Sequence, residues 1–187
     1  GTSSVFFPAR LALQVGGLVF TVQPPARHRQ VGIPETMPDR RQPNVARARR
    51  AMSLLKPMKL WHRYEARGLE NIPRAGAALM VFHHSLATYD SFMLGVEVFE
   101  ETGRFIRGLG HDRLFQTARL RELALDVGIV PASPTAGTEL LAEGELVGVA
   151  PGGMWEALRP RGERFQTRWQ DRRGFCRLAL RSQVPLI

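Results

Sequence analysis

The pattern of apolar and polar positions changes character along the chain. Near-continuous apolar runs such as ALMVFH (78–83) and ELVGVAP (145–151) are typical of strands buried on both faces. The stretches between these runs repeat apolar residues every three or four positions, which indicates helices. The pattern predicts strands over 64–68, 78–83, 104–109, 128–131, 145–151 and 184–187, and helices over 45–64, 90–101, 114–126, 135–143 and 172–183.

This alternation of strands and helices predicts an α/β fold with a mainly parallel sheet flanked by helices. The first helix, over 45–64, has apolar residues on one face and arginines on the other, and Pro57 should kink or split it. A basic amphipathic helix of this kind is typical either of a helix that lies on lipid or of a packed surface helix. The last predicted strand stops at Ile187, so we expect the domain to be truncated at its C-terminus.

Two segments precede the predicted domain, which we place at residues 46–187. Residues 1–22 are mostly apolar, but Arg10 and Gln14 interrupt the run, and its cleanest part is too short to span a bilayer comfortably. Three interpretations stand: a membrane-associated segment, a targeting peptide, or a packed piece of the fold. Residues 23–45 contain five prolines and many Arg and Gln residues, which predicts a linker.

The positive charge is concentrated in the first third of the chain. The net charge is +9, yet residues 1–60 hold ten Lys and Arg against only two Asp and Glu. A folded nucleic-acid-binding domain more often carries such charge on the domain itself, so we expect no nucleic-acid partner. A basic segment beside an apolar one fits an anionic membrane surface better.

The stretch VFHHSLATYD (81–90) is the first candidate for chemistry. His84 follows a predicted buried strand, at the strand end where α/β folds place their sites. Asp90 opens the next predicted helix, and the intervening loop can turn its carboxylate toward the imidazole. An aspartate bonded to one ring nitrogen fixes the tautomer of a histidine that acts as a general base. On spacing alone, a loop histidine and a helix-capping aspartate are the simpler interpretation.

A second candidate is VAPGGMWEALRP, in which a predicted strand ends in three residues, Pro151, Gly152 and Gly153. Adjacent glycines let main-chain N–H groups approach a ligand oxygen closely. Glu156 falls in the first turn of the helix that follows. An ordinary strand-to-helix turn explains the same residues.

A third candidate is WQDRRGFCRLAL (169–180). Arg172 and Arg173 precede an amphipathic helix, where basic side chains could contact phosphate groups. A solvated basic face is the alternative. The single cysteine of the chain, Cys176, lies in this stretch and excludes an internal disulfide.

Several well-known motifs are absent from the sequence. It contains no G-x-S-x-G serine elbow, no G-x-x-x-x-G-K-[ST] phosphate loop and no G-x-G-x-x-G dinucleotide motif. His83 and His84 are adjacent and the cysteine lies far along the chain, so no zinc-binding spacing emerges. We therefore expect no metal site.

Taken together and in order, the three stretches resemble the glycerolipid acyltransferases of the lysophospholipid acyltransferase superfamily. The similarity is closest to the branch that contains diacylglycerol acyltransferase type 2 and its transmembrane-protein relatives. It runs from Trp61 to Ile187, through YEARGLENIPRAGAALMVFHHSLATYD, RFIRGLGHDRLF, LVGVAPGGMWEAL and RRGFCRLALRSQVPLI. The resemblance also implies a further segment after VPLI.

The resemblance implies roles for individual residues. His84 corresponds to the catalytic base and Asp90 to its partner. Five residues separate the two here, as in the branch named, whereas four are usual in the superfamily. The residues that the resemblance assigns to substrate binding are Pro151, Gly152, Gly153, Glu156 and Arg173.

The four residues after Pro151 indicate which class of acceptor the site would take. Phosphate-accepting members of the superfamily have Glu-Gly-Thr-Arg there, and this chain has Gly-Gly-Met-Trp, so Trp155 replaces the arginine. An indole ring cannot bind a phosphate bidentately. We expect a neutral acceptor, such as a mono- or diacylglycerol or a fatty alcohol, unless Arg159 or Arg161 restores the phosphate contact.

The function expected is transfer of a fatty acyl group from acyl-CoA to a lipid hydroxyl. Acyl-CoA is a co-substrate in this reaction, and no cofactor is needed. The partners are then acyl-CoA, a lipid acceptor and a membrane surface, such as that of the endoplasmic reticulum or another intracellular membrane; the oligomeric state stays open. The alternatives are a catalytically inactive lipid-binding homologue and a basic nucleic-acid-binding protein.

Overall fold

The chain divides into two units, Gly1–Met37 and Pro38–Ile187. A computed structural model describes residues 11–15, 18–22, 42–84, 89–158, 160–163 and 166–187. In the first unit, the described residues form two antiparallel strands, β1 (Leu11–Val15) and β2 (Leu18–Val22). Of the linker expected over 23–45, positions 23–41 lie outside the described residues. No helix within the described ranges is long and apolar enough to cross a membrane.

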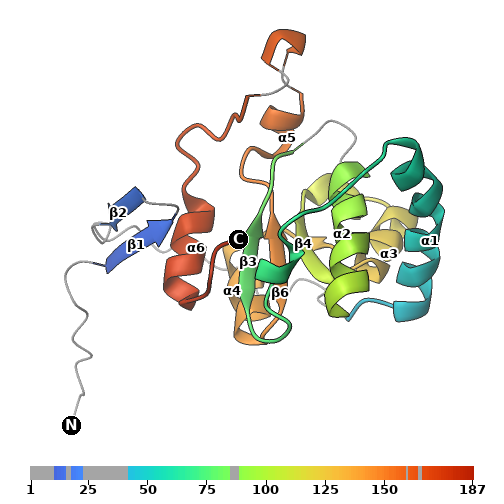
Figure 1. Cartoon of the computed structure of the whole chain (residues 1–187), viewed down its shortest axis with the longest axis horizontal. Coiled ribbons are helices and arrows are strands. Elements are labelled where there is room, and N and C mark those ends of the chain that lie inside the picture. The colour runs from blue at the N-terminus through green and yellow to red at the C-terminus, as the bar shows by residue number, and fades with distance from the viewer. Residues whose placement is uncertain (1–10, 16–17, 23–41, 85–88, 159, 164–165) are drawn as a thin grey trace. The chain divides into compact units, whose positions relative to one another are not determined.

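The described residues of the second unit form a four-stranded parallel sheet (Figure 1). The last of these strands along the chain lies between the first and the second. It pairs in parallel with the first strand, from Ala78↔Leu146 to Val81↔Val149. This topology confirms the predicted α/β fold. The strands, in their order across the sheet, are β3 (Ala78–Val81), β6 (Leu146–Val149), β4 (Ile106–Gly110) and β5 (Val130–Pro131).

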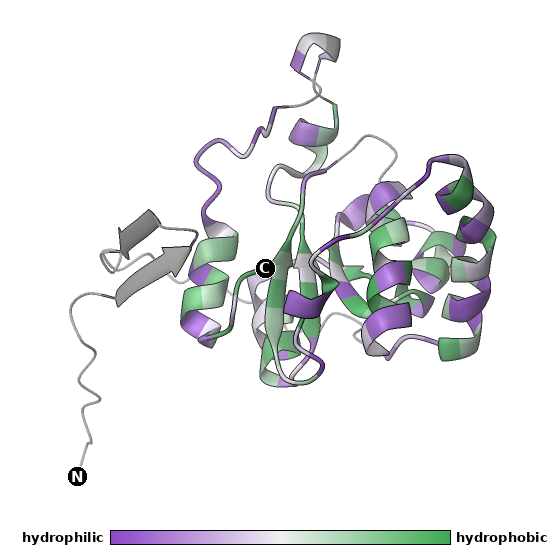
Figure 2. Ribbon diagram, in the orientation of Figure 1, coloured by the Kyte–Doolittle hydropathy of each residue, from purple (hydrophilic) through white to green (hydrophobic). Residues whose placement is uncertain are grey.

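Helices cover both faces of this sheet. Ala78 and Met80 are buried on the face that packs against α2, whereas Leu79 and Val147 are buried on the face covered by α4 and α6. Because alternate residues of β3 point to opposite faces and both are covered, the strand is apolar throughout (Figure 2). The helices are α1 (Val45–Trp61), α2 (Tyr89–Thr102), α3 (Ala118–Asp126), α4 (Pro134–Ala142), α5 (Gly153–Ala157) and α6 (Gly174–Ser182), with short 3₁₀ turns η1 (Leu69–Asn71), η2 (Asp112–Phe115) and η3 (Arg161–Glu163).

Capping side chains determine where several helices begin. The side chains of Asn44, Thr117 and Ser133 accept hydrogen bonds from main-chain N–H groups in the first turns of α1, α3 and α4. Each of these helices would otherwise leave N–H groups without a partner at its N-terminus. Pro134 follows its cap at the first helical position, where the missing N–H costs nothing.

The final residues of the chain extend the sheet on the outer side of β3. Leu186 pairs with Leu79 in parallel, and the main-chain N–H of Leu79 donates to the carbonyl of Pro185 at 2.9 Å. The N–H of Val81 likewise donates to the carbonyl of Ile187 at 2.8 Å. The segment 184–187, predicted as a strand, thus forms an isolated parallel bridge at Leu186 beside β3 and not a full strand.

Two local predictions are wrong. Residues 64–68 form no strand, and at their start the N–H of Tyr64 donates to the carbonyl of Lys59 in the turn that ends α1. Pro57 does not split α1, which runs as one helix through it. Pro57 is exposed, so water can bind the carbonyl that loses its helical partner there.

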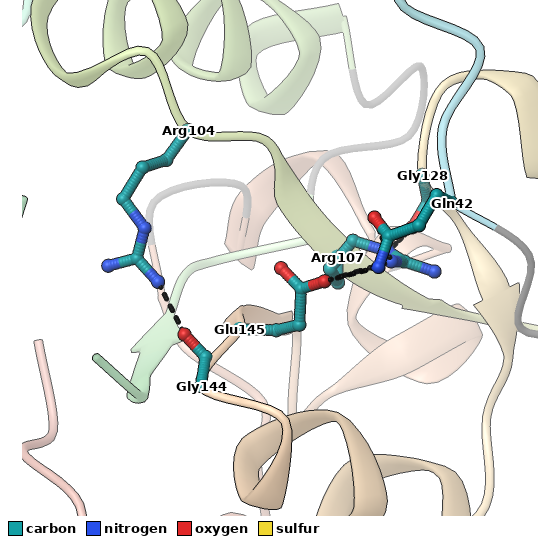
Figure 3. Close-up of polar contacts among 6 residues, drawn as sticks. All are labelled: Gln42, Arg104, Arg107, Gly128, Gly144 and Glu145. Carbon is teal, nitrogen blue, oxygen red and sulfur yellow. Dashed lines mark hydrogen bonds and ion pairs between the residues drawn. The ribbon is translucent and has the colours of Figure 1, made fainter. Parts of the chain in front are cut away.

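Two arginines tie together the amino ends of the strands (Figure 3). The guanidinium of Arg107 is fully buried and donates to the carbonyl of Gly128 and to the side chains of Gln42 and Glu145, at 3.3–3.4 Å. Arg104 donates to three main-chain carbonyls, those of Pro73, Gly76 and Gly144. Gly76, Gly128 and the pair Gly144 and Glu145 lie just before β3, β5 and β6 begin, so structural contacts occupy this edge of the sheet.

Candidate functional site

The candidate site lies at the opposite edge, where β3 and β6 end side by side. Phe82 continues the pairing beyond β3, since its N–H donates to the carbonyl of Val149 at 3.1 Å. His83 and His84 follow directly. On the neighbouring strand, the chain turns through Pro151 into α5 (Figure 1). The parallel register therefore brings the histidines and the glycine-containing turn together, as carboxyl ends of neighbouring parallel strands do.

Glu156 joins these two strand ends. Its side chain is fully buried, and one carboxylate oxygen, Oε2, accepts a hydrogen bond from the main-chain N–H of His84 at 2.9 Å. The other oxygen, Oε1, accepts one from the N–H of Arg168 at 3.0 Å and lies 3.9 Å from Nε2 of His83. Charge-assisted bonds of this kind offset the cost of burying a carboxylate.

Asp90 lies in the first turn of α2, as predicted. Residues 85–88, which connect it to His84, lie outside the described residues, and the hydrogen bond between the two side chains stays a prediction. The Asp90 carboxylate acts on its surroundings electrostatically. After burial, which is the main cause, its charge contributes to raising the pKa of Tyr64 above the ordinary value.

Gly152 and Gly153 of the turn are required for different physical reasons, one for space and the other for backbone conformation. Gly153 has a φ of +50°, in the left-handed region that favours glycine. Gly152 is in ordinary right-handed helical backbone, but a Cβ there would lie 2.3 Å from Cβ of Glu156. The turn is further held by Arg172, whose guanidinium donates to the carbonyl of Gly152 at 2.8 Å and to that of Pro151 at 3.4 Å.

Of the two neighbouring arginines, Arg172 contacts the glycine turn. The side chain of Arg173, which was predicted to bind substrate, is 76% exposed and lies 3.8 Å from the carboxylate of Asp171. The sequence offers no signal to separate two adjacent arginines, because the side-chain directions depend on the loop that precedes α6.

The surface beside the turn combines aromatic and basic groups. Trp155 is half exposed, and the guanidinium of Arg168 lies over its ring, 5.2 Å from the centroid. Arg168 also forms an ion pair with Glu163 at 3.0 Å. Arg168 was missed in the sequence because it follows the motif by a dozen positions. Of the two arginines considered for phosphate binding, Arg159 lies outside the described residues and Arg161 opens η3.

The described residues offer little support for a metal site or a nucleophilic cysteine. Within the parts of the chain that the structure describes, no group of three or more His, Cys, Asp or Glu residues could hold a metal ion. Burial raises the pKa of the Cys176 thiol, which disfavours the thiolate that a nucleophilic cysteine needs. The histidines at the end of β3 are thus the better candidates for catalysis.

Known proteins are similar to this chain in the same region. The family model "Acyltransferase" matches residues 63–187. The "DGAT1/2-independent enzyme synthesizing storage lipids" is 33% identical in Bos taurus and 34% in Homo sapiens, each over 129 residues that cover 68% of this chain and 38% and 39% of the relative. An uncharacterized protein of Mycobacterium bovis is 38% identical over 136 residues, 69% of this chain and 37% of the relative.

The chain thus spans less than two fifths of the length of these curated relatives. No solved structure matches it. The family match covers the four-stranded sheet, both histidines, the glycine turn and α6. The chain therefore belongs to the Acyltransferase family.

Proposed function

We propose that this domain transfers a fatty acyl group from acyl-CoA to a lipid hydroxyl, with His84 as the general base. The observation that carries the proposal is the position of His84, at the carboxyl end of β3 beside the glycine turn and within the matched region. The names of the mammalian relatives, which refer to the synthesis of storage lipids, support a lipid substrate.

The proposed reaction needs one proton shuttle. The imidazole of His84 removes the proton from the acceptor hydroxyl as its oxygen attacks the thioester carbonyl of acyl-CoA. The new C–O bond forms, the C–S bond breaks, and the coenzyme A sulfur leaves with the proton returned by the imidazolium. Asp90 stabilises the imidazolium, and such general-base catalysis contributes ~10²–10⁴-fold. No acyl-enzyme forms in this scheme.

The acceptor we propose is a neutral glycerolipid, such as a mono- or diacylglycerol, as in the branch of diacylglycerol acyltransferase type 2. Trp155 supports this choice, since it stands where phosphate-accepting relatives have an arginine and presents an exposed ring. Arg168 lies over that ring and is already paired with Glu163. A lysophospholipid is the alternative acceptor, to be compared with the neutral glycerolipid.

We further propose that the edge that bears the site faces a membrane. Helix α1 has no acidic residue, and Leu60 and Trp61 at its end are 82% and 86% exposed. The ring of His62, which follows, stacks on that of Tyr89 at 5.2 Å, so this end of α1 lies beside the start of α2. Apolar side chains together with basic ones fit an anionic lipid surface.

The test is acyl transfer by the purified chain. Labelled acyl-CoA is incubated with a panel of vesicle-borne neutral lipids, lysophospholipids and fatty alcohols, and products are separated by chromatography. His84→Ala should abolish the product, whereas His111→Asn, at an exposed histidine, should leave it unchanged. Product formation by His84→Ala at the wild-type rate would rule out the proposed base, and binding of lipid without transfer would favour an inactive homologue.

A further inference from the structure

Glu156 is buried between the strand ends that form the candidate site. Its side chain has no exposed surface, and its two oxygens accept main-chain N–H groups from segments on either side, His84 at 2.9 Å and Arg168 at 3.0 Å. These segments are 72 and 12 residues away along the chain. A single carboxylate thus connects the end of β3, the first turn of α5 and the loop before α6.

The glycine four residues earlier makes room for this carboxylate. A Cβ on Gly152 would lie 2.3 Å from Cβ of Glu156 and 2.6 Å from its Oε2, the oxygen that binds His84. The backbone of Gly152 is ordinary, with φ −69° and ψ −26°, so space and not conformation requires the glycine. The spacing of the P-G-G-x-x-E motif therefore has a physical reason within the fold.

We propose that Glu156 is a positioning residue that fixes the main chain of His84, and so aims the imidazole at the acceptor hydroxyl. The proposal rests on the proposed function, in which His84 is the base. Because the carboxylate is buried, it acts on the reaction through the groups that it holds, and of these His84 is the proposed base. Misplacement of a catalytic group by about 1 Å can cost on the order of 10²-fold in rate.

Kinetics separate a positioning role from direct substrate binding. Glu156→Ala removes both acceptors, and we expect kcat to fall by about 10- to 100-fold, with KM for both substrates within about twofold of wild type. Glu156→Gln keeps one acceptor oxygen and should lie between wild type and alanine. Glu70→Gln makes the same chemical change at an exposed position and should have no effect. A higher acceptor KM at unchanged kcat would overturn the proposal.

Amide exchange tests the hydrogen bond without using activity. The chain has five histidines, so ¹⁵N-histidine labelling gives few signals. The His84 amide should exchange at least about 10-fold faster in Glu156→Ala than in wild type, whereas that of His62, which donates to Met58 at the end of α1, should not change.

If the alanine variant fails to fold, amide exchange in the wild-type protein alone still tests the proposal. Exchange of the wild-type His84 amide at the rate of an unstructured peptide would overturn the proposal, and slow exchange supports it. A wild-type chain that transfers no acyl group to any acceptor would instead refute the proposed function. The exchange rates would then still decide whether Glu156 fixes the main chain of His84.

Discussion

Arg107 is a buried charged group whose removal should cost several kcal/mol of stability. Its guanidinium has no exposed surface and donates to three acceptors, the carbonyl of Gly128 and the side chains of Gln42 and Glu145. Arg107→Met keeps the length of the aliphatic stem but removes the donor, and the Glu145 carboxylate then keeps the bond from the Gln42 amide at 2.9 Å but loses its cationic partner. Removing one partner of a buried ion pair costs about 3–5 kcal/mol, and the 22% exposure of Glu145 places the effect near the lower end.

We therefore expect a loss of about 3 kcal/mol from the free energy of unfolding, a large fraction of the roughly 5–15 kcal/mol typical of a domain. Urea denaturation followed by circular dichroism measures it, and at a slope of about 2 kcal/mol/M the midpoint should fall by about 1.5 M. Arg74→Met is the matched control. Arg74 pairs with Glu101 at 2.5 Å but is 71% exposed, so the loss there should stay below about 1 kcal/mol. Equal losses in the two variants would refute the argument from burial.

Three further predictions concern the acceptor, the glycine turn and the lipid contact. Trp155→Arg should raise the ratio of kcat/KM for a lysophosphatidate to that for a diacylglycerol by about tenfold, because a guanidinium binds phosphate bidentately; an unchanged ratio in the acceptor panel would contradict this role. Arg172→Gln should lower kcat/KM by more than Arg173→Gln in the same assay, because Arg172 donates to the glycine turn and Arg173 pairs with an exposed aspartate. Replacing Leu60 and Trp61 by serine should weaken co-sedimentation with anionic vesicles by about tenfold or more at unchanged melting temperature, and equal binding would exclude this end of α1 from the lipid contact.

The strands and most helices could be predicted because their signals are local. A strand such as ALMVFH, buried on both faces, must be apolar throughout, and caps such as Ser133 mark helix starts within a residue or two. The strand predicted over 64–68 was wrong because a run of mixed residues after a helix is compatible with a strand. The hydrogen bond from Tyr64 back to Lys59, which the sequence does not reveal, shows a turn there instead.

The places of the candidate residues at strand ends could be predicted, but their contacts could not. His84 and the glycine turn were expected at strand ends, and only the register of β3 with β6 shows that these ends are neighbours. Glu156 was assigned to substrate binding, and its burial could not be read from its position in a first helical turn. The choice between Arg172 and Arg173 likewise depends on loop geometry that no periodicity encodes.

The sheet order has a consequence for how the domain is made. β6 lies between β3 and β4, yet it follows both along the chain (Figure 1). Until residue 149 has been synthesised, β3 and β4 lack their common neighbour, and each presents an unpaired edge. Non-local pairing of this kind is slow and exposes hydrophobic surface to aggregation. A nascent chain stalled before β6 should therefore depend on chaperones, and the His84–Glu156 contact can form only once the chain beyond β6 has been synthesised.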